Sequence, residues 1–99
     1  MVNEVILVGV IKQIEDADEF KKNIKLNIER QFRDGYERKF DTILCKYWKS
    51  IFEKVIKNID IGDTVAIKGR IEEENNSFVV MIENFVLLNK TKHNVLKTK

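Results

Sequence analysis

Five stretches of the chain carry the apolar pattern of β-strands, and one carries the spacing of a helix. The expected strands cover residues 4–14, 24–33, 36–47, 64–73 and 78–88. The second alternates most clearly, with Ile24 and Leu26 on one side and Lys25 and Asn27 on the other. The Asp-Gly dipeptide at 34–35 predicts a hairpin turn between the second and third strands.

The first of these stretches is the most continuous. Residues 2–11 read VNEVILVGVI, a run too short to span a membrane and suited to a buried strand. Gly9 inside the run predicts either a β-bulge or the close approach of another backbone.

One helix is expected over residues 49–58, ended by the turn-forming residues 60–63. Its apolar positions recur at helical spacing and are expected to face the core: Trp48, Ile51, Phe52, Val55, Ile56 and Ile59. Three strands, a helix and two further strands follow the order of the OB-fold. The expected fold is therefore an all-β, five-stranded Greek-key barrel with one α-helix between strands 3 and 4.

Composition adds bounds to this picture. The 99 residues are 43% hydrophobic, which suits a single domain with one modest core. We expect this domain to occupy residues 1–89 and to be followed by a flexible, lysine-rich tail at 90–99. Neither a membrane-spanning run nor a signal sequence is evident, so a cytoplasmic location is expected.

The sequence offers little for catalysis or for metal binding. Its four glycines stand singly, so a glycine-rich phosphate loop is not expected. Cys45, the only cysteine, occupies an inward position of the third strand and is expected to be structural. His93, the only histidine, falls in the tail. We therefore expect a protein that is not an enzyme and that needs no cofactor or metal.

Charge and aromatic rings concentrate in the middle of the chain. Residues 21–49 contain nine basic and four acidic side chains, although the whole chain carries a net charge of only +2. Basic side chains neutralise phosphates and aromatic rings stack on unpaired bases, so this mixture favours binding of single-stranded nucleic acid. The candidate DNA-binding residues are Phe32, Trp48, Phe40, Tyr36, Arg30, Arg33, Arg38, Lys39, Lys46 and Lys49.

Each aromatic ring also has a structural interpretation. Trp48 lies where the third strand meets the helix, and core packing alone would explain it. Phe20 could serve either role, whereas Phe52, Phe78 and Phe85 are expected in the core. The basic residues could likewise form an ordinary solvated strand face.

Four segments, in order and at fitting spacing, resemble the bacterial single-stranded DNA-binding protein family. They are VNEVILVG at 2–9, the strand at 24–32 that ends in an aromatic residue, ILCKYWKS at 43–50, and IGDTVAIKGRI at 61–71. The likeness extends over residues 2 to about 88. It implies sequence-independent binding of single-stranded DNA in replication, recombination or repair, and a nucleoid-associated location.

The resemblance also implies roles for individual residues. Phe32 and Trp48 occupy positions of the family's stacking aromatics, and Phe40 matches less well. Where the family has a further aromatic on the strand 4–5 hairpin, this chain has Asn76, beside the acidic run at 72–74. The resemblance implies a homo-oligomer, dimer or tetramer, through strand 1. The family recruits replication proteins through an acidic C-terminal tip; this sequence ends in Lys97-Thr98-Lys99, so we expect no such recruiting tail.

Two alternatives remain open at this stage. The chain could be an OB-fold module that contacts proteins of a replication complex and binds single strands only weakly, similar to primosomal replication protein N. The short, acidic strand 4–5 hairpin favours this alternative, and the basic strands 2 and 3 favour DNA binding. The sequence could also be the core of a longer protein.

Overall fold

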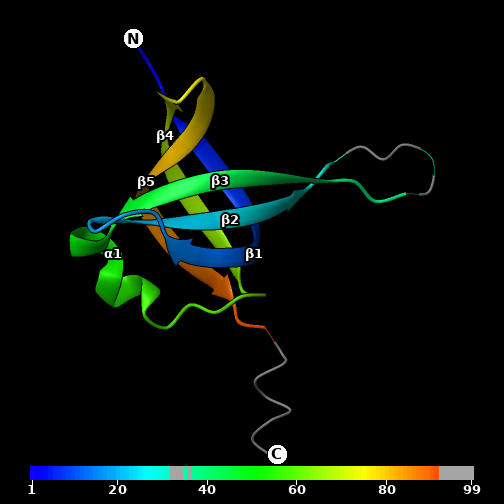
Figure 1. Cartoon of the computed structure of the whole chain (residues 1–99). Coiled ribbons are helices and arrows are strands. Elements are labelled where there is room, and N and C mark those ends of the chain that lie inside the picture. The colour runs from blue at the N-terminus through cyan, green and yellow to red at the C-terminus, as the bar shows by residue number, and fades with distance from the viewer. Residues whose placement is uncertain (32–34, 36, 92–99) are drawn as a thin grey trace, which may run out of the picture.

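The computed structural model describes residues 1–31, 35 and 37–91 (Figure 1). The elements follow in the order β1 (Val5–Asp16), β2 (Lys21–Glu29), β3 (Phe40–Trp48), α1 (Lys49–Ile56), β4 (Thr64–Glu74) and β5 (Ser77–Asn89). The expected order is confirmed. Two boundaries differ most from expectation: β2 ends four residues earlier than predicted, and β3 begins four residues later.

The five strands form a closed barrel in the order β1-β2-β3-β5-β4. The first half of β1 pairs with β4 and its second half with β2, both antiparallel. A short parallel pairing of β3 with β5 closes the barrel. This arrangement, with α1 between β3 and β4, is the OB-fold that the sequence predicted. No helix in the described part of the chain is long and apolar enough to cross a membrane.

Alternation along the strands builds the core. Inward-facing side chains come from all five strands and from α1, and the most completely buried include Ile11, Ile24, Leu26, Val65 and Ile67. Cys45 is also fully buried, and burial raises the pKa of its thiol to about 12. The thiol therefore stays protonated and inert at neutral pH, as its inward strand position predicted.

Gly9 marks a close approach between strands. A Cβ atom at this position would lie 2.5 Å from the carbonyl oxygen of Asn27, so a side chain cannot fit there. The register of β1 against β2 shifts later, between Ile11 and Gln13. Of the two predictions for Gly9, close approach is therefore confirmed, and the bulge lies further along the strand.

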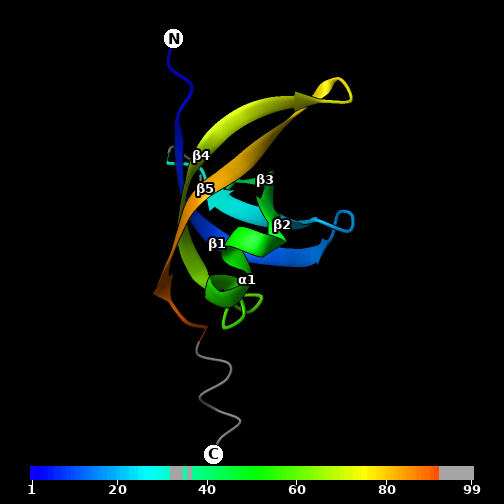
Figure 2. The same ribbon diagram turned by 90° about the vertical axis from the view of Figure 1, so that its left-hand side faces the viewer.

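Some apolar side chains of α1 and of the β4–β5 hairpin were predicted to lie in the core but are exposed. Phe52 and Ile56 pack into the core, but Ile51 is 64% exposed and Val55 is 51% exposed. The helix has eight residues and covers one end of the barrel (Figure 2), so only one narrow stripe reaches the core. Phe78, also predicted to be in the core, is 71% exposed, because β4 and β5 extend beyond the barrel at their hairpin.

A buried carboxylate organises the turn after α1 and the exit of β5. Asp63 is fully buried and accepts hydrogen bonds from the backbone amides of Asp60 and Thr91, both at 2.8 Å, and from Lys90 Nζ at 3.0 Å. Burial alone would raise the pKa of Asp63, but these donors lower it below its usual value. Lys90 and Thr91, predicted as the start of a tail, are thus held against the barrel. Residues 92–99 lie outside the described residues.

Candidate nucleic-acid interface

The outer face of β2 and β3 carries the exposed aromatic and basic side chains. The two strands pair antiparallel over their full length, from Lys21 opposite Trp48 to Glu29 opposite Phe40. Directly opposed residues share a face, so every second residue points outward. We call this face the β2–β3 strip; its members are Lys21, Asn23, Lys25, Asn27 and Glu29 of β2 and Phe40, Thr42, Leu44, Lys46 and Trp48 of β3.

An aromatic ring lies at each end of the strip. Phe40 begins β3 and is 50% exposed, and Trp48 ends β3 and is 39% exposed. They are eight positions apart along β3, which at about 3.3 Å per residue places them roughly 26 Å apart. A cation covers each ring: Lys21 Nζ lies 4.5 Å from the Trp48 ring centroid, and the Arg38 guanidinium carbon lies 5.4 Å from that of Phe40.

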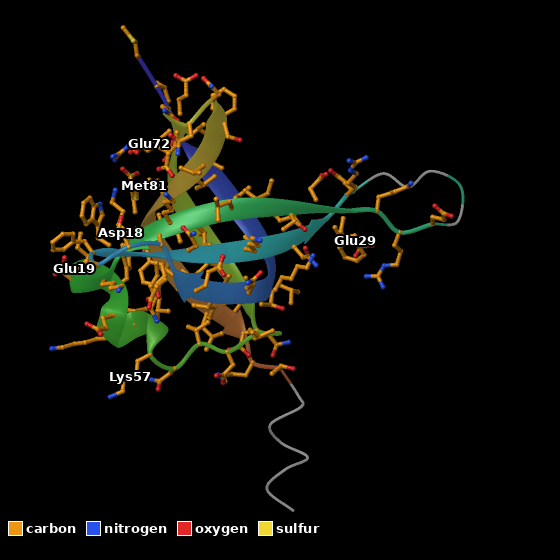
Figure 3. All side chains as sticks on the ribbon, in the orientation of Figure 1. Asp18, Glu19, Glu29, Lys57, Glu72 and Met81 are labelled. Carbon is orange, nitrogen blue, oxygen red and sulfur yellow. The ribbon has the colours of Figure 1, made fainter. Side chains whose placement is uncertain are left out.

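The Trp48 end of the strip is fixed by the β1–β2 loop. The Asp18 carboxylate accepts hydrogen bonds from the amides of Phe20 at 2.7 Å and Lys21 at 2.9 Å. The Phe20 amide is the main cause of the lowered pKa of Asp18. The Phe20 carbonyl in turn accepts from the Lys49 amide at the start of α1. Phe20 itself is 62% exposed, so this third ring is also open to solvent near Trp48. Figure 3 shows Asp18 at this end of the strip and Glu29 at the other.

Polar side chains occupy the middle of the strip. The Thr42 hydroxyl donates a hydrogen bond to Asn27 Oδ1 at 2.7 Å, across the two strands. Lys25, opposite Leu44, forms no ion pair within the described residues. Asn23 Oδ1 is buried and lacks a hydrogen-bond partner there.

Most of the predicted basic residues are paired with carboxylates. Arg30 holds Asp41 through two guanidinium nitrogens and thereby lowers the pKa of that carboxyl. Arg38 holds Glu29 in the same way, at 2.7 and 2.8 Å. The other three pairs are Lys39 with Glu37, Lys46 with Glu74, and Lys49 with Asp16.

The acidic β4–β5 hairpin contributes directly to this neutralisation. Glu72 and Glu74 share one face of the hairpin, and Glu73 lies on the other face, opposite Phe78. Glu74 reaches the strip and pairs with Lys46, whose side chain keeps only 13% exposure. Glu72 pairs with Arg70 instead. Figure 3 shows Glu72 above β3, on the hairpin.

The structure gathers some of the predicted site residues and adds others. Phe40, Lys46 and Trp48 share the strip, and Arg38 joins them over the Phe40 ring. The predictions for Phe32, Arg33 and Tyr36 lie outside the described residues. The sequence reasoning missed the other residues of the strip, namely Lys21, Asn23, Lys25, Asn27, Glu29, Thr42 and Leu44. Alternation had already placed Lys25 and Asn27 on the outward face, which was the signal available for them.

Comparisons with known proteins support the fold. No protein-family model matches the chain, and no curated protein matches it in sequence. Among solved structures, the dimeric N-terminal domain of PriB from Thermoanaerobacter tencongensis is 22% identical, with 89% of this chain and 98% of that one covered and a TM-score of 0.70.

Two further solved structures are similar. The mitochondrial single-stranded DNA-binding protein Rim1 of S. cerevisiae is 12% identical, covering 92% of this chain and 100% of that one, at a TM-score of 0.73. A small single-stranded DNA-binding protein of Mycoplasma pneumoniae is 19% identical, with 87% of this chain and 93% of that one covered and a TM-score of 0.68. These likenesses extend over nearly the whole of each chain and establish the shared OB-fold.

Proposed function

We propose that this protein binds single-stranded DNA without sequence specificity, in replication, recombination or repair. The observation that carries the proposal is the strip itself, because exposed aromatic rings and lysines share one face of two paired strands. Proteins whose names describe single-stranded DNA binding share the fold. OB-folds bind single strands with site sizes of about 4–16 nucleotides, and a strip roughly 26 Å long accommodates several stacked or extended nucleotides.

Each part of the strip has a distinct role in this proposal. Trp48 and Phe40 stack on bases, which is worth about 1–3 kcal/mol per base and tolerates any sequence. Lys25, between the rings, and Lys21, beside Trp48, neutralise phosphates. The amide and hydroxyl groups of Asn27 and Thr42 supply hydrogen bonds that do not depend on one base. Proton transfer and bond cleavage need no part in this function, so the proposed activity is binding alone.

Self-association through β1 is the second part of the proposal. Ile6, Val8 and Val10 alternate on the outer face of β1 and are 71%, 51% and 41% exposed. The pairing of β1 with β4 and of β4 with β5 extends this apolar face to Ala66 and Val86. A contiguous apolar face on three paired strands is typical of an interface between subunits. The PriB domain of the same fold is described as dimeric.

The alternative function is a protein-interaction module in a replication complex with weak single-strand binding. The ion pairing of most basic residues around the strip favours it, since paired cations attract phosphate less. Affinity for DNA distinguishes the two functions. Binding of oligo-dT that is strong and depends on the strip supports our proposal, whereas binding that ignores the strip supports the alternative.

A titration with oligo-dT tests the proposal. Stacking on Trp48, the only tryptophan, should quench its fluorescence. Phe40→Ala should weaken binding about fivefold to 150-fold, the equivalent of losing about 1–3 kcal/mol of stacking. Phe78→Ala is the matched control, because Phe78 is also exposed but lies on the far face of the β4–β5 hairpin. Unchanged fluorescence at low salt with excess oligo-dT would contradict the proposal.

A further inference from the structure

A cavity opens between α1 and the end of the barrel, away from the β2–β3 strip. Its volume is about 540 Å³, within the roughly 300–1,000 Å³ of small-ligand sites. Its floor is apolar and is formed by Ile14 of β1, Tyr47 of β3, Ile56 of α1 and Ile59. We call it the α1 cavity. Figure 2 shows the end of the barrel where α1 lies.

The wall of the α1 cavity is strongly basic. Four lysines line it against a single carboxylate, that of Glu53. Two of them, Lys22 and Lys49, are near the exposed Asp16 carboxylate, at 3.9 and 3.3 Å. The other two, Lys54 and Lys57, form no ion pair within the described residues. Figure 3 shows Lys57 at the far end of α1. The α1 cavity thus presents positive charge that the surrounding residues leave uncompensated.

The floor of the α1 cavity also carries a hydroxyl group, that of Tyr47. Tyr47 is 3% exposed, its ring meets Phe52 edge-on at 6.3 Å, and its hydroxyl forms no hydrogen bond within the described residues. Burial, followed by the nearby charges of Asp16 and Glu53, raises the pKa of Tyr47. The hydroxyl therefore stays protonated and can donate to an oxygen atom of a ligand. Because Tyr47 lines the cavity, a ligand carboxylate that enters it can accept this hydrogen bond.

We infer that the α1 cavity is a docking site for a peptide segment of a partner protein that carries both acidic and aliphatic side chains. The aliphatic side chains enter between Ile14, Ile56 and Ile59. The acidic side chains pair with Lys54 and Lys57 at the rim, and one carboxylate accepts a hydrogen bond from the Tyr47 hydroxyl. Binding at this site is independent of DNA binding on the strip, so one subunit can hold both ligands.

The floor distinguishes a peptide from a nucleic acid. Single strands bind where aromatic rings offer open faces for stacking, and the one aromatic ring of the α1 cavity, Tyr47, is buried against Phe52. Its remaining floor is aliphatic, which suits the side chains of a peptide and offers bases no stacking surface. The charge pattern and the apolar floor together therefore fit an acidic, apolar peptide.

Fluorescence anisotropy of a labelled peptide tests this inference on the full chain. The probe is a peptide of about ten residues in which aspartates alternate with leucines, and the control peptide has lysines in place of the aspartates. We expect saturable binding of the acidic peptide that salt weakens, and about tenfold weaker binding of the basic peptide.

Three variants locate the binding site. Lys54→Glu and Lys57→Glu should each lower the affinity for the acidic peptide about tenfold, because each replaces an attraction by a repulsion. Tyr47→Phe keeps the ring packing and should weaken it about fivefold through loss of the hydroxyl donor. Lys12→Glu is the matched control: it makes the same charge change on β1, outside the cavity lining, and should leave the affinity within about twofold.

Oligo-dT binding separates this inference from the proposed function. All four variants should bind oligo-dT as the unaltered protein does, and saturating oligo-dT should not displace the peptide. The inference is wrong if the basic peptide binds equally well, or if Lys12→Glu weakens binding as much as Lys54→Glu. It is also wrong if Lys54→Glu and Lys57→Glu weaken the binding of oligo-dT but not the binding of the peptide, since the cavity would then hold nucleic acid.

Discussion

The ion pair between Lys46 and Glu74 allows a sharp test of how the acidic hairpin affects DNA binding. Lys46 lies on the β2–β3 strip two residues before Trp48, and Glu74 holds it from the β4–β5 hairpin. Glu74→Gln removes the carboxylate and keeps the shape of the side chain. Because Lys46 can then neutralise a phosphate, the variant should bind single-stranded DNA more tightly than the unaltered protein.

The structure sets the size of this effect. A partly exposed ion pair is worth up to about 1 kcal/mol, so its removal should tighten binding about fivefold at low salt. Each phosphate neutralised on a single strand changes the slope of log K against log salt by about −0.7. One additional lysine contact should therefore steepen the slope by about 0.7. The gain in affinity should shrink as the salt concentration rises.

Titrations of oligo-dT by Trp48 fluorescence, at several salt concentrations, measure both quantities. Glu73→Gln is the control, because it makes the same charge change one residue away on the opposite face of the hairpin. We expect its slope to stay unchanged and its affinity to rise by less than about twofold. Equal effects of the two variants would show that only net charge matters and would refute the role assigned to the ion pair.

Three further predictions concern stability and assembly. Because hydrogen bonds lower the pKa of Asp63, its contribution to stability is present above its unfolded pKa of about 4 and is lost as pH falls through its folded value. Asp63→Asn should cost about 2–3 kcal/mol at pH 7 and less at pH 3, as measured by urea unfolding. Gly69→Ala should lower the melting temperature strongly, because its Cβ would lie 2.1 Å from the Met81 carbonyl oxygen, whereas Gly35→Asn, at a turn with open space, should change it little. Val8→Asp should convert an oligomer to monomers in light scattering, without changing the fold by circular dichroism.

The order of the strands and the helix along the chain could be predicted from sequence, because each strand alternates or forms a continuous apolar run. Burial of single side chains was harder to predict. Ile51 and Val55 fit the helical spacing, yet α1 covers only one end of the barrel and buries a narrower stripe than its apolar residues define. Phe78 fits a strand pattern but lies where β4 and β5 have left the barrel. The apolar spacing predicts on which side of a helix or strand a residue lies. Packing against the rest of the protein decides whether that side is buried.

The charges of the site could not be predicted from composition. The basic excess between residues 21 and 49 suggested many free cations, and the fold brings carboxylates distant in sequence to several of them. Glu74 lies 28 residues from Lys46. Asp16 ends β1, whereas its partner Lys49 begins α1. Lys21 and Lys25, outside the predicted set, instead lie on the strip. Pairing of this kind depends on register between strands, which spacing along one strand does not reveal.

This pairing determines what must supply the affinity for DNA. Among the described residues, Lys21 and Lys25 are the lysines of the strip that form no ion pair, so the slope of log K against log salt should be about −1.4 for each subunit. In the proposed function, so shallow a slope would mean that stacking on Trp48 and Phe40 provides most of the binding free energy. Two or more subunits joined through β1 would bind one strand at several such strips, and effective concentration would then raise the affinity without new contacts. Disrupting the β1 face should therefore weaken binding to long oligo-dT far more than binding to oligomers short enough for one strip.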